Sequence, residues 1–433
     1  MTTAVYEPDP SFVLAAGRGV AQFADQIFTH LPRADQRRWA GVYLLGLLAV
    51  EGRKSVRSLA AAVTDSPTAS QSMHRFVNAS PWEWQLARAE LTRWVEQRLR
   101  PTAWTVGTAV VPKRGNQSCG VHRRFDPALG RTVNCQVGMG LFLAAGRCQI
   151  PVDWHLHLPG EWADERLRSR ARIPEGVRPV PGWVHVLSFA DRLAASLSTP
   201  LPLVTDLRGF EQYERLLHGL RRRGHNFLVA VPENLPVALP SPGRNPRSSD
   251  AVPSMSARRF LDAHGETPRT VVAASHGGTT GVKRVVTAVV GLPHGPHAQH
   301  ICRLFAEYPA DRRNAPVLWL TSLTQQPLNR LTELAAAHAW TSGAVRRMEG
   351  GFGLQDFEGR SYPGWHRHVT LVSAASAYSQ LAHTTPTPPA PPAPRTASPG
   401  SPLPARRQNR PLDPADGRWT VETANGHTQP LNR

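Results

Sequence analysis

The stretch that decides the fold class is Asp191–Val231, DRLAASLSTPLPLVTDLRGFEQYERLLHGLRRRGHNFLVAV. Two amphipathic segments, Asp191–Ser198 and Phe210–Arg223, each precede a short apolar run, Leu201–Thr205 and Asn226–Val231. A helical period that gives way each time to a strand-like run is typical of chains that alternate helices and strands. The sequence therefore predicts an α/β fold with a mixed sheet flanked by helices.

Strand-like and helical runs on either side extend this prediction. Trp104–Val111 and Val133–Ala144 are β-rich runs bounded by Gly and Pro, and we assign residues 101–231 to the first part of the core. A Pro/Ser/Arg-rich stretch and three further strand-like runs then indicate a β-rich insertion over residues 232–325: Thr270–Ala274, Arg284–Leu292 and Val317–Leu323. Residues 326–382 are predicted to be helical again, with helices at Pro327–Ala339 and Trp365–Leu381.

Residues 1–100 read as helices, with apolar residues at three- and four-residue spacing in Phe12–Leu31, Trp39–Val50 and Trp82–Leu99. Ser55–Phe76 offers two short helices around an Asp-Ser-Pro turn, the shape of a small DNA-binding region. An ordinary helical bundle explains the periodicity equally well. Residues 383–433 form a Pro-rich basic tail, which we expect to be extended.

The composition indicates an anionic polymer as the partner. The 433 residues hold 50 Lys and Arg against 32 Asp and Glu, a net charge of +18 that also suits ribosomal and membrane-surface proteins. The apolar run Gly41–Val50 is too short to cross a bilayer, and no secretory leader precedes it. We therefore expect a cytoplasmic, nucleoid-associated protein without a membrane partner. The four cysteines form no C-x-x-C pair, which favours reduced thiols over a metal knuckle.

Seven marks in sequence order resemble the DDE-superfamily transposases of bacterial insertion sequences. They are GLLAVEGRKSVR (46–57), RFVNASPW (75–82), PKRGNQSCGV (112–121), NCQVG (134–138), PVDWHLHLPGEW (151–162), Asp206 at a strand end, and GLQDFEGRSYPGWHRH (353–368). The resemblance implies an RNase H-like core with a β-rich insertion. It also implies three carboxylates that bind two divalent metals and cut and join DNA strands in active relatives.

The family's first two acids correspond to position 107 or 108 and to Asp206 in this chain. The family's first aspartate stands on the strand before the Pro-Lys pair that matches Pro112 and Lys113, where this chain carries Gly107 and Thr108. The second acid matches Asp206, which follows a short apolar strand, at the edge where α/β sites usually lie.

The third acid belongs on a helix that begins near the Trp matching Trp340, three residues further on. That place holds Gly343, and Glu349 is the nearest acid. Six residues correspond to about 240° of net rotation, so we expect Glu349 to point away from the face of Gly343.

One carboxylate cannot hold two dications, which require hard oxygen ligands. We therefore predict a catalytically degenerate transposase that needs no cofactor; magnesium or manganese would be needed only by an active enzyme. Because glycine weakens a strand interior, we read Gly107 as a position released from constraint.

Basic residues near the open face of the core are expected to bind phosphates of double-stranded DNA, and a homo-oligomer on DNA fits this picture. The predicted DNA-binding residues are Arg75, Lys113, Arg114, Arg123, Arg124, Arg221, Arg222, Arg223, Arg346, Arg347 and Arg367. Two alternatives stay open: an active transposase whose acids come from shifted positions such as Glu349, and a scaffold or adaptor that acts through its Pro-rich tail.

Overall fold

The computed structural model describes residues 10–126, 130–208, 212–240, 253–274, 280–293, 301–308 and 315–384. Most of the predicted Pro-rich tail lies outside these residues. The described part begins with helices only: α1 (Pro10–Ile27), α2 (Ala34–Ala49), α3 (Val56–Ala61), α4 (Ala69–Asn78) and α5 (Trp84–Leu99). The prediction of two short helices within Ser55–Phe76 is confirmed by α3 and the start of α4.

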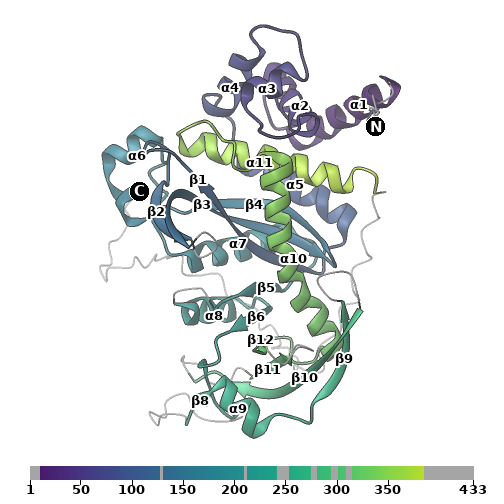
Figure 1. Cartoon of the computed structure of the whole chain (residues 1–433), viewed down its shortest axis with the longest axis vertical. Helices are drawn as coiled ribbons and strands as arrows, with labels where there is room; N and C mark the ends of the chain where they lie inside the picture. Colours follow the sequence, from purple (N-terminus) through teal and green to yellow (C-terminus); the bar gives the residue numbers. More distant parts are fainter. Residues whose placement is uncertain are drawn as a thin grey trace, which may run out of the picture. The chain divides into compact units, whose positions relative to one another are not determined.

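The core sheet has the strand order β4-β3-β1-β5-β6 (Figure 1). β3 is antiparallel to β1 and β4, whereas β5 is parallel to β1 and β6. This topology is that of an RNase H-like core, so the predicted mixed sheet is confirmed. The strands are β1 (Ala103–Pro112), β3 (Arg131–Ala145), β4 (Cys148–Leu156), β5 (Leu203–Asp206) and β6 (Phe227–Val231).

The stretch read as a β-rich insertion continues this same sheet beyond β6. Antiparallel pairing runs from β6 through β12, β11 and β10 to β9. These strands are β9 (Arg269–Ala274), β10 (Thr280–Gly291), β11 (Ile301–Tyr308) and β12 (Val317–Thr321). The small pair β7 (Pro236–Val237) and β8 (Met255–Ser256) precedes α9 (Ala257–His264).

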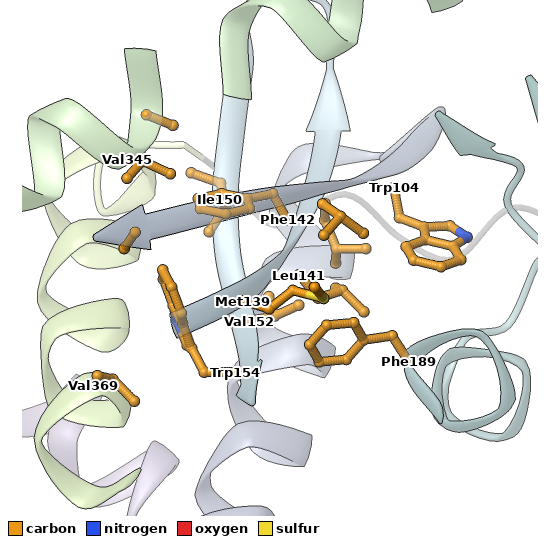
Figure 2. Packing of buried hydrophobic residues seen from close by; sticks show 14 of the residues in the cluster. Trp104, Met139, Leu141, Phe142, Ile150, Val152, Trp154, Phe189, Val345 and Val369 are labelled. Atoms are coloured by element: carbon orange, nitrogen blue, oxygen red, sulfur yellow. The ribbon is translucent and has the colours of Figure 1, made fainter. Parts of the chain in front are cut away.

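Helices pack on both faces of the core sheet. Figure 2 shows Val345 of α10 (Leu328–Phe352) and Val369 of α11 (Tyr362–Leu381) on the side of Phe142 and Trp154, with Phe189 of α7 (Gly182–Ser196) on the opposite side. α7 in turn packs against α8 (Tyr213–Arg222). α10 begins at Leu328 and runs unbroken past Trp340, so the expectation of a helix that begins near Trp340 is wrong.

α11 is a helix buried on almost every side. It contacts β4 on one side and α2, α4 and α5 on others, and almost every residue from Tyr362 to Ala377 is buried. A helix that is covered all round needs apolar or small residues on every face. The run Ser373–Ala377 (SAASA) provides the small ones. No described helix is both long enough and apolar enough to span a bilayer.

The buried guanidinium of Arg88 joins three of these elements. From α5 it donates to Asp153 Oδ1 at 2.8 Å and to the Trp154 carbonyl at 2.7 Å, both on β4. It also donates to Thr370 Oγ1 at 2.8 Å and to the His366 carbonyl at 3.0 Å, both on α11. Because it is only 4% exposed, these partners must replace the water that the charge loses.

Replacing Arg88 with methionine is expected to lower the free energy of unfolding by about 3–5 kcal/mol. The substitution removes one of the two cations that are paired with the largely buried Asp153 carboxylate. Urea unfolding followed by circular dichroism measures this. The control is Arg93→Met on the same helix, whose exposed pair with Glu90 contributes about 1 kcal/mol or less. Equal losses in the two variants would contradict the role given to Arg88.

A buried histidine makes the junction of α2 and α11 sensitive to acid. His368 lies 3.1 Å from the Tyr43 hydroxyl through Nδ1 and 3.0 Å from the Gly353 carbonyl through Nε2. Burial lowers its pKa to about 4, below the ordinary 6.5. The unfolded chain therefore takes up this proton first as the pH falls, and stability is lost between pH 6.5 and 4.

The His368→Gln variant is expected to lose less stability between pH 6.5 and 5 than the wild type, by about 1 kcal/mol per pH unit. Urea unfolding at a series of pH values tests this, with the exposed His74→Gln as control. If the two variants show the same pH dependence, the protonation of His368 does not limit stability in acid.

Candidate functional site

Asp206 and Gly107 stand on neighbouring parallel strands, each two residues beyond the last residue of its strand that is paired with the other strand. β1 and β5 pair with Thr105 opposite Val204, and the same register continued by two residues sets Gly107 level with Asp206. Side chains alternate along a strand, so Asp206 shares the face of Val204, which packs under α10. His338 of α10 is close enough to affect the charge of Asp206. The resemblance places the catalytic acids at this same point.

No side chain fits at Gly107. A Cβ atom there would lie 2.8 Å from Phe142 Cε2, 2.9 Å from Val345 Cγ2 and 3.0 Å from Thr341 Cγ2. These distances are shorter than van der Waals contact, and two of the three atoms belong to α10. The sequence suggested that position 107 is released from constraint, but the packing around Gly107 contradicts this. Gly107 is the residue that lets α10 approach β1 closely.

Neutral polar groups occupy the space next to Gly107. Thr341 Oγ1 donates to Thr105 Oγ1 at 2.7 Å, and Thr105 Oγ1 lies 3.1 Å from Gln149 Oε1. All three side chains are almost completely buried. The network satisfies polar groups of β1, β4 and α10 without placing a charge between them.

Arg208 forms hydrogen bonds with both carboxylate oxygens of Asp206. Its Nε lies 3.0 Å from each carboxylate oxygen, its Nη2 lies 2.5 Å from Oδ2, and its backbone N–H donates to Oδ1 at 2.9 Å. Burial by itself raises the pKa of Asp206, but the hydrogen bonds and charge of Arg208 outweigh it and hold the pKa below its usual value. The carboxylate is charged, and its charge is already paired.

Gly343 lies on the wrong side of α10 to complete the site. Thr341 and Val345 face Gly107, and Gly343 is two residues from each, or about 200° around the helix. A Cβ atom at Gly343 would find only Arg347 Nη1, at 3.7 Å. Gly343, the residue matched to the third acid, therefore does not share the face of α10 that meets Gly107.

Glu349 is one helical turn beyond Val345, so it lies near the sheet side of α10 and not on the side opposite to it. The rotation of about 240° expected for Glu349 is counted from Gly343, and Gly343 itself points away from the sheet. The Glu349 carboxylate is half-buried, which raises its pKa, and it is hydrogen-bonded to Gln355. Gln355 in turn donates to the Val110 carbonyl at 3.4 Å.

The residues do not fit a pair of divalent metals at this point. Within the described ranges, no three His, Cys, Asp or Glu side chains gather in a way that could hold a metal ion. The family's first acid position has no room for a side chain, and the second carries an arginine on both oxygens. We derive no metal-dependent step from this arrangement.

Two of the predicted DNA-binding residues, Lys113 and Arg367, make hydrogen bonds to backbone carbonyls within the fold. Lys113 Nζ donates to the Phe357 carbonyl at 2.7 Å, and burial lowers its pKa to about 8. Arg367 is 6% exposed and donates to the carbonyls of Trp82 at 3.1 Å and Val77 at 3.3 Å. Both cations thus have a role in packing, and the expectation that they bind DNA stays a prediction.

The other predicted basic residues lie on separate elements: Arg75 on α4, Arg114 after β1, Arg346 and Arg347 on α10, and the three arginines of 221–223 at the end of α8. Arg123 and Arg124 are on β2 (His122–Asp126). Arg221 is half-buried, and Arg223 is paired with Asp191 at 3.1 Å. The structure does not gather this set around Asp206. The exposed members are Arg75, Arg114, Arg123, Arg124, Arg222, Arg223, Arg346 and Arg347.

Sequence reasoning missed Arg208 and His338, the two residues next to Asp206. Arg208 follows Asp206 by two positions, a spacing that alone does not distinguish a bidentate partner from a solvated charge. His338 comes from a helix more than a hundred residues later in the chain, and no local pattern connects it to β5.

A family model described as "DDE superfamily endonuclease" matches residues 26–289. Among solved structures, a cryo-EM structure of the piggyBac transposase synaptic complex with hairpin DNA is similar at a TM-score of 0.39 and 10% identity, over 87% of this chain and 75% of that one. No curated protein matches.

Alanine substitutions at the two glycines are expected to act in opposite directions. Gly107→Ala should lower stability by about 1–3 kcal/mol, because the added methyl group meets Phe142 and α10. Gly343→Ala should raise stability by about 0.5–1 kcal/mol, because it adds a helix-favouring residue where there is room. Urea unfolding of both variants measures the difference. A Gly107→Ala protein as stable as wild type would show that α10 is not packed closely on β1.

Proposed function

This chain belongs to the family of DDE superfamily endonucleases, and from that premise we propose that it is a transposase-like DNA-binding protein unable to cleave and join DNA. The proposal has two parts, loss of catalysis and retention of binding. Each depends on different residues and has its own test.

The packing at Gly107 carries the first part. Strand transfer in this family needs several carboxylates around two dications, and an aspartate at position 107 would have to displace Phe142 or α10. An unpaired carboxylate in that buried space would also cost several kcal/mol of desolvation. The pairing of Asp206 with Arg208 adds to this, because a metal would have to compete with a guanidinium that donates to both oxygens.

The charge of the chain supports the second part. Its net charge is +18, and eight of the predicted basic residues are exposed in the structure. Phosphates of double-stranded DNA are the partner that such a surface favours, and counterion release makes this binding strongly dependent on salt. With Lys113 and Arg367 set aside because they bond to backbone carbonyls, the proposed contact residues are Arg75, Arg114, Arg123, Arg124, Arg222, Arg223, Arg346 and Arg347. The alternative of an active transposase that uses Glu349 has less support, because the Glu349 carboxylate is hydrogen-bonded to Gln355.

The wild-type protein is expected to bind double-stranded DNA with an affinity that falls steeply with salt, and to leave that DNA uncut in magnesium or manganese. Fluorescence anisotropy at several salt concentrations measures binding. Nicking and strand transfer are followed on supercoiled plasmid and on linear DNA that carries candidate element ends.

Asp206→Asn is the matched control for catalysis. It should leave both DNA affinity and the absence of cleavage unchanged. Cleavage by the wild type that disappears in Asp206→Asn would overturn the inactive centre, whereas a wild type that fails to bind DNA at low salt would overturn the binding function.

A further inference from the structure

β2 and the start of β3 form a two-stranded ribbon that extends past its neighbours. β2 pairs with residues Arg131–Cys135 of β3. β1 joins β3 only from Cys135, and β4 joins it only from Gly138. Residues 131–134 of β3 are therefore paired with β2 alone among the named strands. We call residues 122–126 and 131–135 the β2–β3 ribbon.

The ribbon has a buried base and an exposed outer part. Val133 and Cys135 belong to a small apolar cluster with Val137, which fixes the ribbon to the sheet. On β2, Arg123, Arg124 and Phe125 are all exposed, and Phe125 is 58% exposed. Most of this aromatic ring is therefore uncovered beside two arginines, where it can contact a partner.

The two arginines of the ribbon are held by no carboxylate among the described side chains. Basic residues at the far end of the same sheet differ, since Lys283 is paired with Glu307 at 2.8 Å and Arg269 with Glu266 at 3.1 Å. Among the described side chains, Arg123 and Arg124 therefore have hydrogen-bond donors available for a partner. A planar guanidinium suits phosphate oxygens and guanine edges, to which it donates two bonds at once.

Side chains alternate along β2, so Arg123 and Phe125 share one face of the ribbon and Arg124 lies on the other. The major groove of B-DNA admits a two-stranded ribbon and presents guanine acceptors and thymine methyl groups. An arginine and an apolar ring on one face match those two features. Arg124, on the opposite face, is left to contact phosphates.

We propose that the β2–β3 ribbon enters the major groove of double-stranded DNA, with Arg123 and Phe125 against base edges and Arg124 on the phosphates. This inference rests on the proposed DNA-binding function and assigns it to one element of the fold.

The test compares charge-matched double variants of the full chain. Arg123→Gln/Arg124→Gln removes the ribbon's charges, and Arg215→Gln/Arg259→Gln removes two exposed arginines from α8 and α9. Binding to double-stranded DNA is measured by anisotropy over a range of salt. The ribbon variant should lose about tenfold or more in affinity at 0.1 M salt, with a slope of log K against log salt smaller by about 1–2. The control should lose about threefold or less.

Phe125→Ser separates groove entry from simple charge attraction. It should weaken binding to double-stranded DNA without changing the salt slope, because no charge is lost. Binding to double-stranded RNA should not respond, since the A-form major groove is too deep and narrow for a ribbon. Unchanged thermal melting of each variant shows that the exposed substitutions leave the fold intact.

Failure of the ribbon and failure of the function give different results. If the wild type binds DNA but the ribbon and control variants lose the same affinity, or if Phe125→Ser binds DNA as the wild type does, the ribbon proposal is overturned and DNA binding stands. If the wild type does not bind DNA at all, the function itself is overturned.

Discussion

The enclosure of α11 is the constraint on which the rest of the chain depends. This helix comes last in the described chain, yet it lies between β4 and the helices α2, α4 and α5 that come first. Few polar groups can be buried there without partners, and the charged ones that are present each make several hydrogen bonds. Arg88 on α5 bonds to α11, and Arg367 on α11 bonds to the end of α4 and to Trp82 in the segment that follows it. The helical and sheet layers are therefore joined by buried polar contacts as well as by apolar packing.

The segments that carry the family resemblance meet around the beginning of α11 and the turn before it. The Lys54 backbone N–H donates to Asp356, the Lys113 ammonium donates to the Phe357 carbonyl, and the Cys119 N–H donates to the Arg360 carbonyl. Trp162 donates to the Val121 carbonyl, which brings in a further segment. These residues are linked because the fold needs their hydrogen bonds at this junction. These segments thus have a role in the architecture of the junction.

At Gly107, the position matched to the family's first acid, the surroundings are close packing and neutral polar groups. α10 approaches β1 closely enough to exclude a Cβ atom at Gly107, and the neighbouring polar groups are hydroxyls and an amide that bond to one another. Such a neutral network costs far less to bury than carboxylates without metal. Asp206 keeps its charge because Arg208 is next to it at the strand end. The arrangement is self-consistent without any ion, which supports the proposal of a binding protein.

By itself, the sequence determined the order and type of the main elements, the mixed α/β class and the place of Asp206 at a strand end. These follow from local periodicity, which records which faces of a helix or strand are buried. It did not identify β2, β4 or β11, where charged residues, histidine and proline interrupt the strand pattern. Only the tertiary structure decided that Gly107 faces α10 while Gly343 faces away, and that Lys113 and Arg367 donate to backbone carbonyls. Those outcomes depend on how closely two distant elements approach and on how a helix is rotated against a sheet, and no short-range pattern encodes either.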